Sequence, residues 1–520
     1  MGDTKFRVPR QLHTSLDQSD LMKKPACLTC LVIGVLVSSP AYAIDPHIRR
    51  VEEGLLPIAA SQPGVPANIE DRMRAYGVPG LSIAVIDGGR IAWAKGYGVA
   101  DSVSGHPVTP NTLFQAASIS KPISAIGALL LVQQGRLQLD ESVNHALRSW
   151  KIPESTFTRD RPVTVRMLLN HTAGLEHVDS DSYPPFSEGD RLPSMPQILR
   201  GEPPARRGGV SVVSIPGGTF VYSAAGYEVL QQLVADVSGQ PFEQFMQAEI
   251  FTPLGMRNST FAQPLPESLR SVAATGHYAG GERLPGRFRV SPELSVAGLW
   301  TTPTDVAKYI ISVQRASAGI AERLLGPTTT REMLRPGLGN RGLGPVISGS
   351  GQSTRFGHDG FNEGFESTFV AYEHQGQGAV VMTNSGFAFM LIKEVLNSVG
   401  RAYGWSDYGV TAQQPPSANI QQQRVSAIPA KTIATVAGEY VLGNTRIILY
   451  RSGSRLLLDW PTNGVAEVFA TPDGRFFCPQ LTFSDVGSPW LKFVLDKSHA
   501  VARILAGDDG SIQFERLNGS

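Results

Sequence analysis

Apolar runs alternate with turn residues along the chain in a pattern that predicts both strands and helices. Two apolar runs, Leu81–Ile86 and Ile91–Gly98, are separated by the turn residues Asp87–Arg90, which indicates an antiparallel hairpin. The apolar stretch Ile123–Val132 is long and stops at Gly135, so it predicts a buried helix.

Further helices, followed by two strands, are predicted after Gly135. Helices are expected at Val165–Leu169 and Ala225–Val237, and another begins at Thr302, which is followed by a proline at the first helical position. Strands are expected at Glu366–Tyr372 and Ala379–Thr383. Helices gathered between an opening hairpin and closing strands predict an α+β fold, an antiparallel sheet covered by helices, over residues 44–410.

The pattern changes after residue 410. Residues 411–430 carry Gln and Pro runs without periodicity and are predicted to be a linker. Beyond it, short β-branched and aromatic runs such as Arg446–Tyr450 and Leu456–Trp460 are separated by turn residues. These hairpin signals predict a small antiparallel β-domain over residues 431–520.

The N-terminal segment predicts export. Two lysines follow Met22, an apolar stretch spans Ala26–Val37, and a small-x-small site ends at Ala43. This order is typical of a secretory signal peptide within residues 1–43, with Met22 as the true start. The alternative is an uncleaved anchor helix, although the apolar stretch is short for a bilayer. We expect a periplasmic or secreted protein with no stable membrane span after cleavage.

Composition and charge exclude several classes of function. Lys plus Arg number 46 and Asp plus Glu number 45, so the net charge is only +1, which argues against nucleic acid as a partner. Cleavage after Ala43 leaves Cys478 as the one cysteine of the mature chain, so no internal disulfide is expected. The mature chain has no CxxC pair and no HExxH motif, and we predict neither a metal site nor a cofactor.

The strongest candidate for chemistry is the S-x-x-K motif formed by Ser118 and Lys121. On a helix, residues three apart share one face, so the amine is expected one turn from the hydroxyl. A serine needs a neighbour that takes its proton, and a lysine does so once burial or nearby positive charge leaves it neutral. Backbone N–H groups at a helix start also suit an oxyanion. Alone, the motif is explained equally well by an ordinary helix start.

Two further motifs favour the catalytic interpretation. Tyr222-Ser223-Ala224 and His358-Asp359-Gly360 follow in order, and with them the chain resembles the serine β-lactamase and penicillin-recognising hydrolase superfamily, in its class C-like branch. That branch includes D-alanyl carboxypeptidases, D-aminopeptidases and esterases, with the motifs S-x-x-K, Y-x-N and K-T-G or H-x-G. The resemblance spans about residues 65–400 and includes the stretches Leu168–Leu175, Pro253–Met256 and Ala297–Thr302. It implies a β-lactamase/transpeptidase-like sheet and a lipocalin-like terminal β-domain.

The resemblance also implies roles for individual residues. Ser118 would be the acylated nucleophile and Lys121 the base that activates it. Tyr222 would share the proton relay and protonate the leaving group. The oxyanion hole would consist of the backbone N–H groups of Ser118 and Phe361.

His358 and Gly360 of the third motif would line the opposite wall. His374 also fits H-x-G, but it falls in a predicted hairpin turn, so we assign it no role. His171 is predicted to be structural.

Two departures from the family pattern bear on the substrate. Ala224 stands where the family has an asparagine that holds the substrate's acylamino group, and His358 replaces a lysine. Histidine is only partly charged near neutral pH, so carboxylate recognition at that position is expected to be weak. Both departures argue against an efficient β-lactamase; His358 favours a peptidase and Ala224 favours an esterase.

Two glycine-rich segments are predicted to be loops. Residues 337–342 fit G-x-G-x-x-G, but Gly344 and Pro345 follow where a helix is needed, so we do not assign a nucleotide site there. Residues 176–218, rich in Pro and Gly, form either a lid or pocket wall or a passive surface loop.

The function expected from these features is that of an exported serine hydrolase acting through an acyl-enzyme. The expected substrates are small peptides with D- or otherwise unusual residues, for example linearised cyclic peptides. The alternatives are a carboxylesterase and, in another class, an inactive penicillin-binding-like module that only binds a ligand.

Overall fold

The structure is a computed structural model of the whole chain, and only part of it is described. The described residues are 46–56, 67–176, 186–278, 281–320, 322–386, 388–405, 428 and 430–516, apart from the segments 443–444, 453–454, 461–463, 471–475, 478–489, 496–500 and 507–511. The predicted signal peptide, Cys478 and most of the predicted linker 411–430 lie outside these residues. The domain boundaries proposed above therefore stay a prediction.

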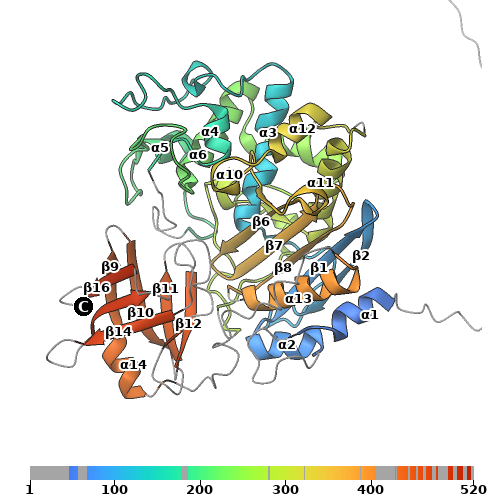
Figure 1. The fold of residues 1–520 in the computed structure, drawn as a ribbon, viewed down its shortest axis with the longest axis vertical. Helices are drawn as coiled ribbons and strands as arrows, with labels where there is room; N and C mark the ends of the chain where they lie inside the picture. Colours follow the sequence, from blue (N-terminus) through green and yellow to red (C-terminus); the bar gives the residue numbers. More distant parts are fainter. Residues whose placement is uncertain are drawn as a thin grey trace, which may run out of the picture. The chain divides into compact units, whose positions relative to one another are not determined.

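A six-stranded antiparallel sheet lies at the centre of the larger part of the chain (Figure 1). The strands in spatial order are β2 (Arg90–Gly98), β1 (Gly80–Asp87), β8 (Gly378–Thr383), β7 (Phe365–Tyr372), β6 (Arg355–Asn362) and β5 (Val346–Ser348). The opening hairpin and the closing pair of strands predicted from the sequence are both confirmed, and they meet where β1 pairs with β8.

Strand β1 has side chains buried on both faces of the sheet because its sequence is apolar at nearly every position. Leu81, Ile83 and Val85 belong to a core shared with one layer of helices. Ala84 and Ile86 belong to a second, larger core. The helices of the first layer are α1 (Pro46–Glu53), α2 (Ile69–Tyr76) and α13 (Phe389–Ala402), labelled in Figure 1.

The larger core contains the remaining helices of this part. These are α3 (Ser120–Gln133), α4 (Val165–Leu169), α5 (Met195–Arg200), α6 (Ala224–Ser238), α7 (Phe242–Met246), α8 (Thr252–Leu254), α9 (Glu267–Arg270), α10 (Leu294–Ala297), α11 (Pro303–Ser317) and α12 (Pro327–Leu334). Helix α3 is buried along most of its length because it is apolar all round. Thr302 caps the start of helix α11, because its Oγ1 accepts a hydrogen bond from the Asp305 N–H, as the sequence predicts.

The C-terminal residues form an antiparallel sheet that closes into a barrel, preceded by α14 (Ala430–Val436). Its strands are β9 (Gly438–Leu442), β10 (Thr445–Ser452), β11 (Arg455–Trp460), β12 (Gly464–Ala470), β13 (Phe476–Phe477), β14 (Trp490–Leu495), β15 (Val501–Ala506) and β16 (Ile512–Arg516). Its core includes Ile433 from α14 and Ile447, Leu458 and Ile504 from the strands. The predicted small β-domain is thus confirmed in its fold.

Strand β6, which carries the third motif, is absent from the sequence-based prediction. Gly357, Asp359 and Gly360 are poor strand formers, so local preference argued against a strand here. Pairing with β7 from Arg355 to Asn362 overrides that preference. Within the described part of the chain, no helix is both long and apolar enough to cross a bilayer.

Candidate active site

The S-x-x-K motif lies at the junction of a short 3-10 turn, η1 (Ala117–Ile119), and helix α3. The Lys121 Nζ donates hydrogen bonds to Ser118 Oγ at 2.9 Å and to the Val296 backbone oxygen at 3.0 Å. Lys121 is only 2% exposed, whereas Ser118 is half-buried. The structure therefore brings the amine and the hydroxyl together as the helical spacing predicts.

The backbone just before Ser118 is strained. Ala117 has a φ of 49°, in the left-handed region, which costs an L-residue about 1–2 kcal/mol. Its neighbour Ala116 is held from two sides, because its N–H donates to Leu299 O at 2.9 Å and its oxygen accepts from Ser367 Oγ at 3.0 Å. The surrounding fold thus fixes the turn that presents the Ser118 hydroxyl.

Tyr222 lies just before helix α6, and His171 holds it there. The ring of His171 packs against that of Tyr222, with 4.4 Å between the centroids and an angle of 36° between the ring planes. Its Nδ1 accepts a hydrogen bond from the Ser223 N–H at 3.2 Å, and its backbone oxygen accepts from the Val221 N–H at 2.9 Å. These contacts fit the structural role predicted for His171.

The positive charges around Tyr222 lower the pKa of its phenol. Burial alone raises the pKa of this phenol. The positive charge of Lys121, hydrogen bonds with Lys121 and Ser118, and the charge of Arg341 outweigh burial, so the pKa of Tyr222 lies below its ordinary value. The Lys121 Nζ is 5.0 Å from the centre of the Tyr222 ring. Tyr222 is therefore suited to take a proton from Ser118.

His358 is buried in β6 and is uncharged at neutral pH. Burial lowers its pKa well below the ordinary value, and the charges of Arg341 and Lys121 lower it further. The Nδ1 is 2.6 Å from the Asp359 backbone oxygen, which only accepts, so Nδ1 carries the proton. The Nε2 then accepts from Arg341 Nη1 at 3.4 Å. His358 therefore offers no positive charge to a substrate.

The positive charge at this position comes from Arg341, which the sequence analysis missed. Its guanidinium lies over the rings of Phe220 and Tyr222, 5.4 and 5.2 Å from their centres. Burial lowers the pKa of Arg341, but from so high a value that it stays charged. Within the described chain, no carboxylate forms an ion pair with it. Arg341 follows the turn η5 (Leu338–Asn340) of the G-x-G-x-x-G loop, and a strand comes next instead of a helix.

Gly360 allows β6 to pass directly beside the Ser118 turn. A Cβ atom at this position would lie 2.2 Å from Ala116 O and 2.6 Å from Ser367 Oγ, far inside van der Waals contact. Phe361, the next residue, has a side chain that is 41% exposed. The backbones of Ser118 and Phe361, the predicted oxyanion donors, therefore lie on neighbouring segments, and their role stays a prediction.

Three other features of the sequence add no side chain to the cluster around Ser118. Ala224 is the first residue of α6 and adds no hydrogen-bonding side chain. His374 lies in the turn between β7 and β8, with its Nε2 3.7 Å from a Glu373 carboxylate oxygen. The segment 176–218 contains helix α5, and its residues 177–185 lie outside the described part.

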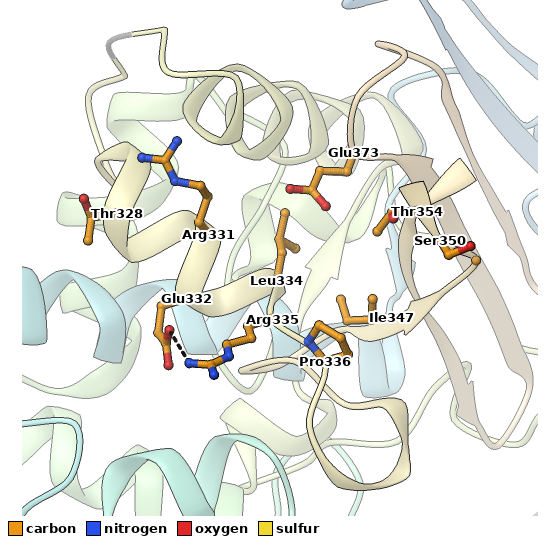
Figure 2. Close-up of a pocket in the computed structure, with 11 residues that line it drawn as sticks. Thr328, Arg331, Glu332, Leu334, Arg335, Pro336, Ile347, Ser350, Thr354 and Glu373 are labelled. Carbon is orange, nitrogen blue, oxygen red and sulfur yellow. Dashed lines mark ion pairs between the residues drawn. The ribbon is translucent and has the colours of Figure 1, made fainter. Parts of the chain in front are cut away.

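A cavity of about 600 Å³ lies elsewhere, between α12 and the β5–β6 strands. Figure 2 shows side chains of α12 on one side of it and Ile347 and Thr354 on the other. Arg335 in its wall forms an ion pair with Glu332, with 3.7 Å between Nη1 and Oε2. None of the predicted site residues lines this cavity, so we do not assign it to the reaction.

Comparison with known proteins agrees with the motifs. The Beta-lactamase family model matches residues 65–391. Protein flp of Staphylococcus aureus (strain MW2) is 25% identical over 336 residues, which are 62% of this chain and 63% of flp. The chain thus spans less than two thirds of that relative's length.

Two other proteins are similar over a larger share of their own length. Esterase EstB of Burkholderia gladioli is 28% identical over 308 residues, 54% of this chain and 76% of EstB. The crystal structure of D-amino acid amidase from Ochrobactrum anthropi SV3, complexed with L-phenylalanine amide, superimposes with a TM-score of 0.54 at 26% identity. That superposition covers 65% of this chain and 96% of the amidase.

Proposed function

This chain belongs to the Beta-lactamase family, the serine hydrolases related to β-lactamases and penicillin-binding proteins, and we propose that it cleaves small substrates through an acyl-enzyme on Ser118. The observation that carries the proposal is the 2.9 Å hydrogen bond from Lys121 Nζ to Ser118 Oγ. The lowered pKa of Tyr222, which is hydrogen-bonded to both side chains, supports it. The proposal includes export after cleavage of the signal peptide.

In this mechanism Lys121 and Tyr222 hold the serine proton as one coupled unit. We assign Tyr222 as the immediate acceptor, because its pKa lies below the ordinary value for a phenol, and the adjacent Lys121 amine shares the relay. The Ser118 oxygen attacks the substrate carbonyl, and the oxyanion is stabilised by the backbone N–H groups of Ser118 and Phe361. Tyr222 then gives the proton to the leaving group, and water hydrolyses the ester formed on Ser118.

The preferred substrates in our proposal are small peptides with D- or unusual residues and a free carboxylate. Arg341 supports the carboxylate, because it is a charged, half-buried fork with no ion-pair partner in the described chain. His358, being neutral, would contribute shape and a hydrogen bond, but no charge. The similarity to a D-amino acid amidase, at 26% identity, supports amide cleavage and D-residues.

A carboxylesterase is the second candidate. Ala224 has no amide that could hold a peptide substrate's acylamino group, and a simple ester has no acylamino group that needs to be held. The similarity to EstB supports this alternative. Esters also have better leaving groups, so a site that protonates the leaving group poorly would still cleave them.

The test combines labelling with turnover by the full-length protein. A fluorophosphonate probe is expected to label Ser118, and the label on the peptide that carries residue 118 should disappear in Ser118→Ala. The matched control is Ser120→Ala, which removes a hydroxyl of the same motif that accepts from the Leu299 N–H and should keep labelling. Turnover of D-residue peptides above that of p-nitrophenyl esters supports the peptidase, and the reverse supports the esterase. Peptide turnover that survives Ser118→Ala rejects the acyl-enzyme on Ser118, and absence of both labelling at Ser118 and turnover indicates an inactive module.

A further inference from the structure

A second serine of the chain is paired with a buried histidine, away from Ser118. Ser102 is exposed in the turn after β2. The neighbouring Asp101 carboxylate fixes this turn, because it accepts hydrogen bonds from the N–H groups of Val103 at 2.8 Å and Ser104 at 3.1 Å. It also accepts from Thr275 Oγ1 at 2.6 Å, which ties the turn to the segment that carries the histidine.

His277 presents its basic nitrogen to the Ser102 hydroxyl. It is fully buried, and its Nε2 is 3.0 Å from Ser102 Oγ. Its Nδ1 is 3.0 Å from the backbone oxygen of Asn384. Because a carbonyl oxygen only accepts, Nδ1 carries the proton and the Nε2 lone pair accepts from the serine. This is the order of groups, hydroxyl, imidazole and acceptor, that activates a serine.

The surroundings keep this arrangement rigid and the imidazole neutral. The Asn384 side chain donates to the backbone oxygens of Ala100 at 3.0 Å and Val99 at 3.2 Å, so the carbonyl that orients His277 is itself held. Burial lowers the pKa of His277. The hydrogen bond to Asn384 and the charge of Asp101 raise this pKa, but they reverse only part of the lowering. A neutral imidazole at neutral pH is ready to take a proton.

A positive charge lies beside the same turn. Arg283 forms an ion pair with Asp101 at 3.0 Å, and its side chain is 39% exposed. It is also paired with His277 through an isolated β-bridge. The guanidinium of Arg283 is thus paired with the carboxylate of Asp101, the residue next to Ser102. The contacts of Ser102 and His277 within the described chain do not include Ser118, Lys121 or Tyr222.

We propose that Ser102 is a second base-activated serine that reacts with acyl and phosphonyl donors. With a fluorophosphonate, the Ser102 oxygen forms a bond to phosphorus, the phosphorus–fluorine bond breaks, and fluoride leaves. The hydroxyl proton passes to His277 Nε2 and then to water. With an activated ester, the oxygen bonds to the carbonyl carbon and the phenolate leaves.

The same turn provides an internal control. Ser104 Oγ is 2.9 Å from the His106 Nδ1, so it too is a serine beside an imidazole. His106, however, is exposed to water, and no described backbone acceptor fixes its ring. If a nearby histidine were enough, Ser104 would react as Ser102 does.

The experiment uses the full-length Ser118→Ala protein with an alkyl fluorophosphonate. Chymotrypsin cleaves after Tyr97 and Phe114 and so separates Ser102 from position 118, whereas trypsin has no site between them. Mass spectrometry is expected to find the adduct on peptide 98–114, at Ser102 and not at Ser104. His277→Asn keeps a donor toward Asn384 O but removes the base, and should slow this labelling by at least about tenfold.

The controls separate loss of reactivity from loss of fold. With Ser118 intact, Ser102→Ala and His277→Asn proteins should still be labelled in the peptide that begins at Gln115, which shows that they are folded. An unlabelled peptide 98–114 in Ser118→Ala, equal labelling of Ser102 and Ser104, or labelling unchanged by His277→Asn would each overturn the proposal. None of these outcomes depends on whether Ser118 itself reacts, since the two serines are read in different peptides.

Discussion

Replacing Arg341 by glutamine tests how the site recognises its substrate. Arg341 lies over the Tyr222 ring at 5.2 Å and donates to His358 Nε2 at 3.4 Å, and it forms no ion pair with a carboxylate of the described chain. If it binds the carboxylate of a peptide, Arg341→Gln removes a charge-assisted hydrogen-bonded pair. Such pairs contribute about 1.5–3 kcal/mol.

That free energy corresponds to a loss of roughly 10- to 150-fold in kcat/KM. The loss should be confined to substrates with a free carboxylate, and a peptide ending in an amide should lose only a few-fold. The assay is therefore kcat/KM for an acid and amide pair of the same peptide, with wild type and with Arg341→Gln. The kcat/KM of Arg341→Lys on the acid should lie between those of wild type and Arg341→Gln, because lysine keeps the positive charge but lacks the two parallel donors of a guanidinium.

Removing the charge of Arg341 should also shift the pH dependence of kcat/KM. The charge of Arg341 helps to lower the pKa of Tyr222, so its removal raises that pKa and moves the acidic limb of the kcat/KM profile to higher pH. The matched control is Arg331→Gln, an arginine of the separate cavity beside α12, which should change neither quantity. Equal losses on the acid and the amide would refute carboxylate binding and leave Arg341 only its effect on Tyr222.

Three further substitutions test the site and the fold. Lys121→Met removes the charge that favours the Tyr222 phenolate and should lower kcat by about 10²–10⁴-fold in a steady-state assay; a loss below tenfold would contradict the relay. Gly360→Ala places a Cβ 2.2 Å from Ala116 O, so kcat should fall by about 10²–10³-fold while circular dichroism stays unchanged. Burial raises the pKa of Glu366 to about 7, above the ordinary value of about 4.3. Protonated Glu366 therefore stabilises the fold at low pH, and this contribution to the free energy of unfolding is lost as pH rises through 7. Urea unfolding at pH 5 and pH 8 should show this loss for wild type and a smaller one for Glu366→Gln.

Local signals explain which elements the sequence predicted well. The β1–β2 hairpin, α3, α4 and the start of α11 are each determined by residues close together in the chain, such as a turn, an apolar run or the Thr302 cap. The closeness of Ser118 and Lys121 is local in the same way, because a helical turn brings residues three apart together. Tyr222 lies about a hundred residues further on, and only the resemblance to a known family placed it in the site.

Non-local effects explain what was missed. Strand β6 forms because β7 pairs along its whole length, although Gly357 and Gly360 disfavour a strand by themselves. Arg341 lies in a glycine-rich loop whose sequence gives no sign that its arginine lies beside Tyr222. Its place beside Tyr222 depends on the folding of the 337–342 loop onto Phe220, a contact between residues far apart in the sequence.

The identity of the residue at 358 and the position of Arg341 are linked by electrostatics. A lysine at 358 would place a second cation within hydrogen-bond distance of Arg341 in a buried site, and the two charges would repel each other strongly. A histidine avoids this because burial and the neighbouring charges keep it neutral, and its Nε2 accepts a hydrogen bond from the guanidinium. His358→Lys is therefore expected to lower activity on free-carboxylate peptides, although lysine is the residue that β-lactamases have there. Combining it with Arg341→Gln should restore part of that activity, and no recovery in the double variant would contradict this coupling.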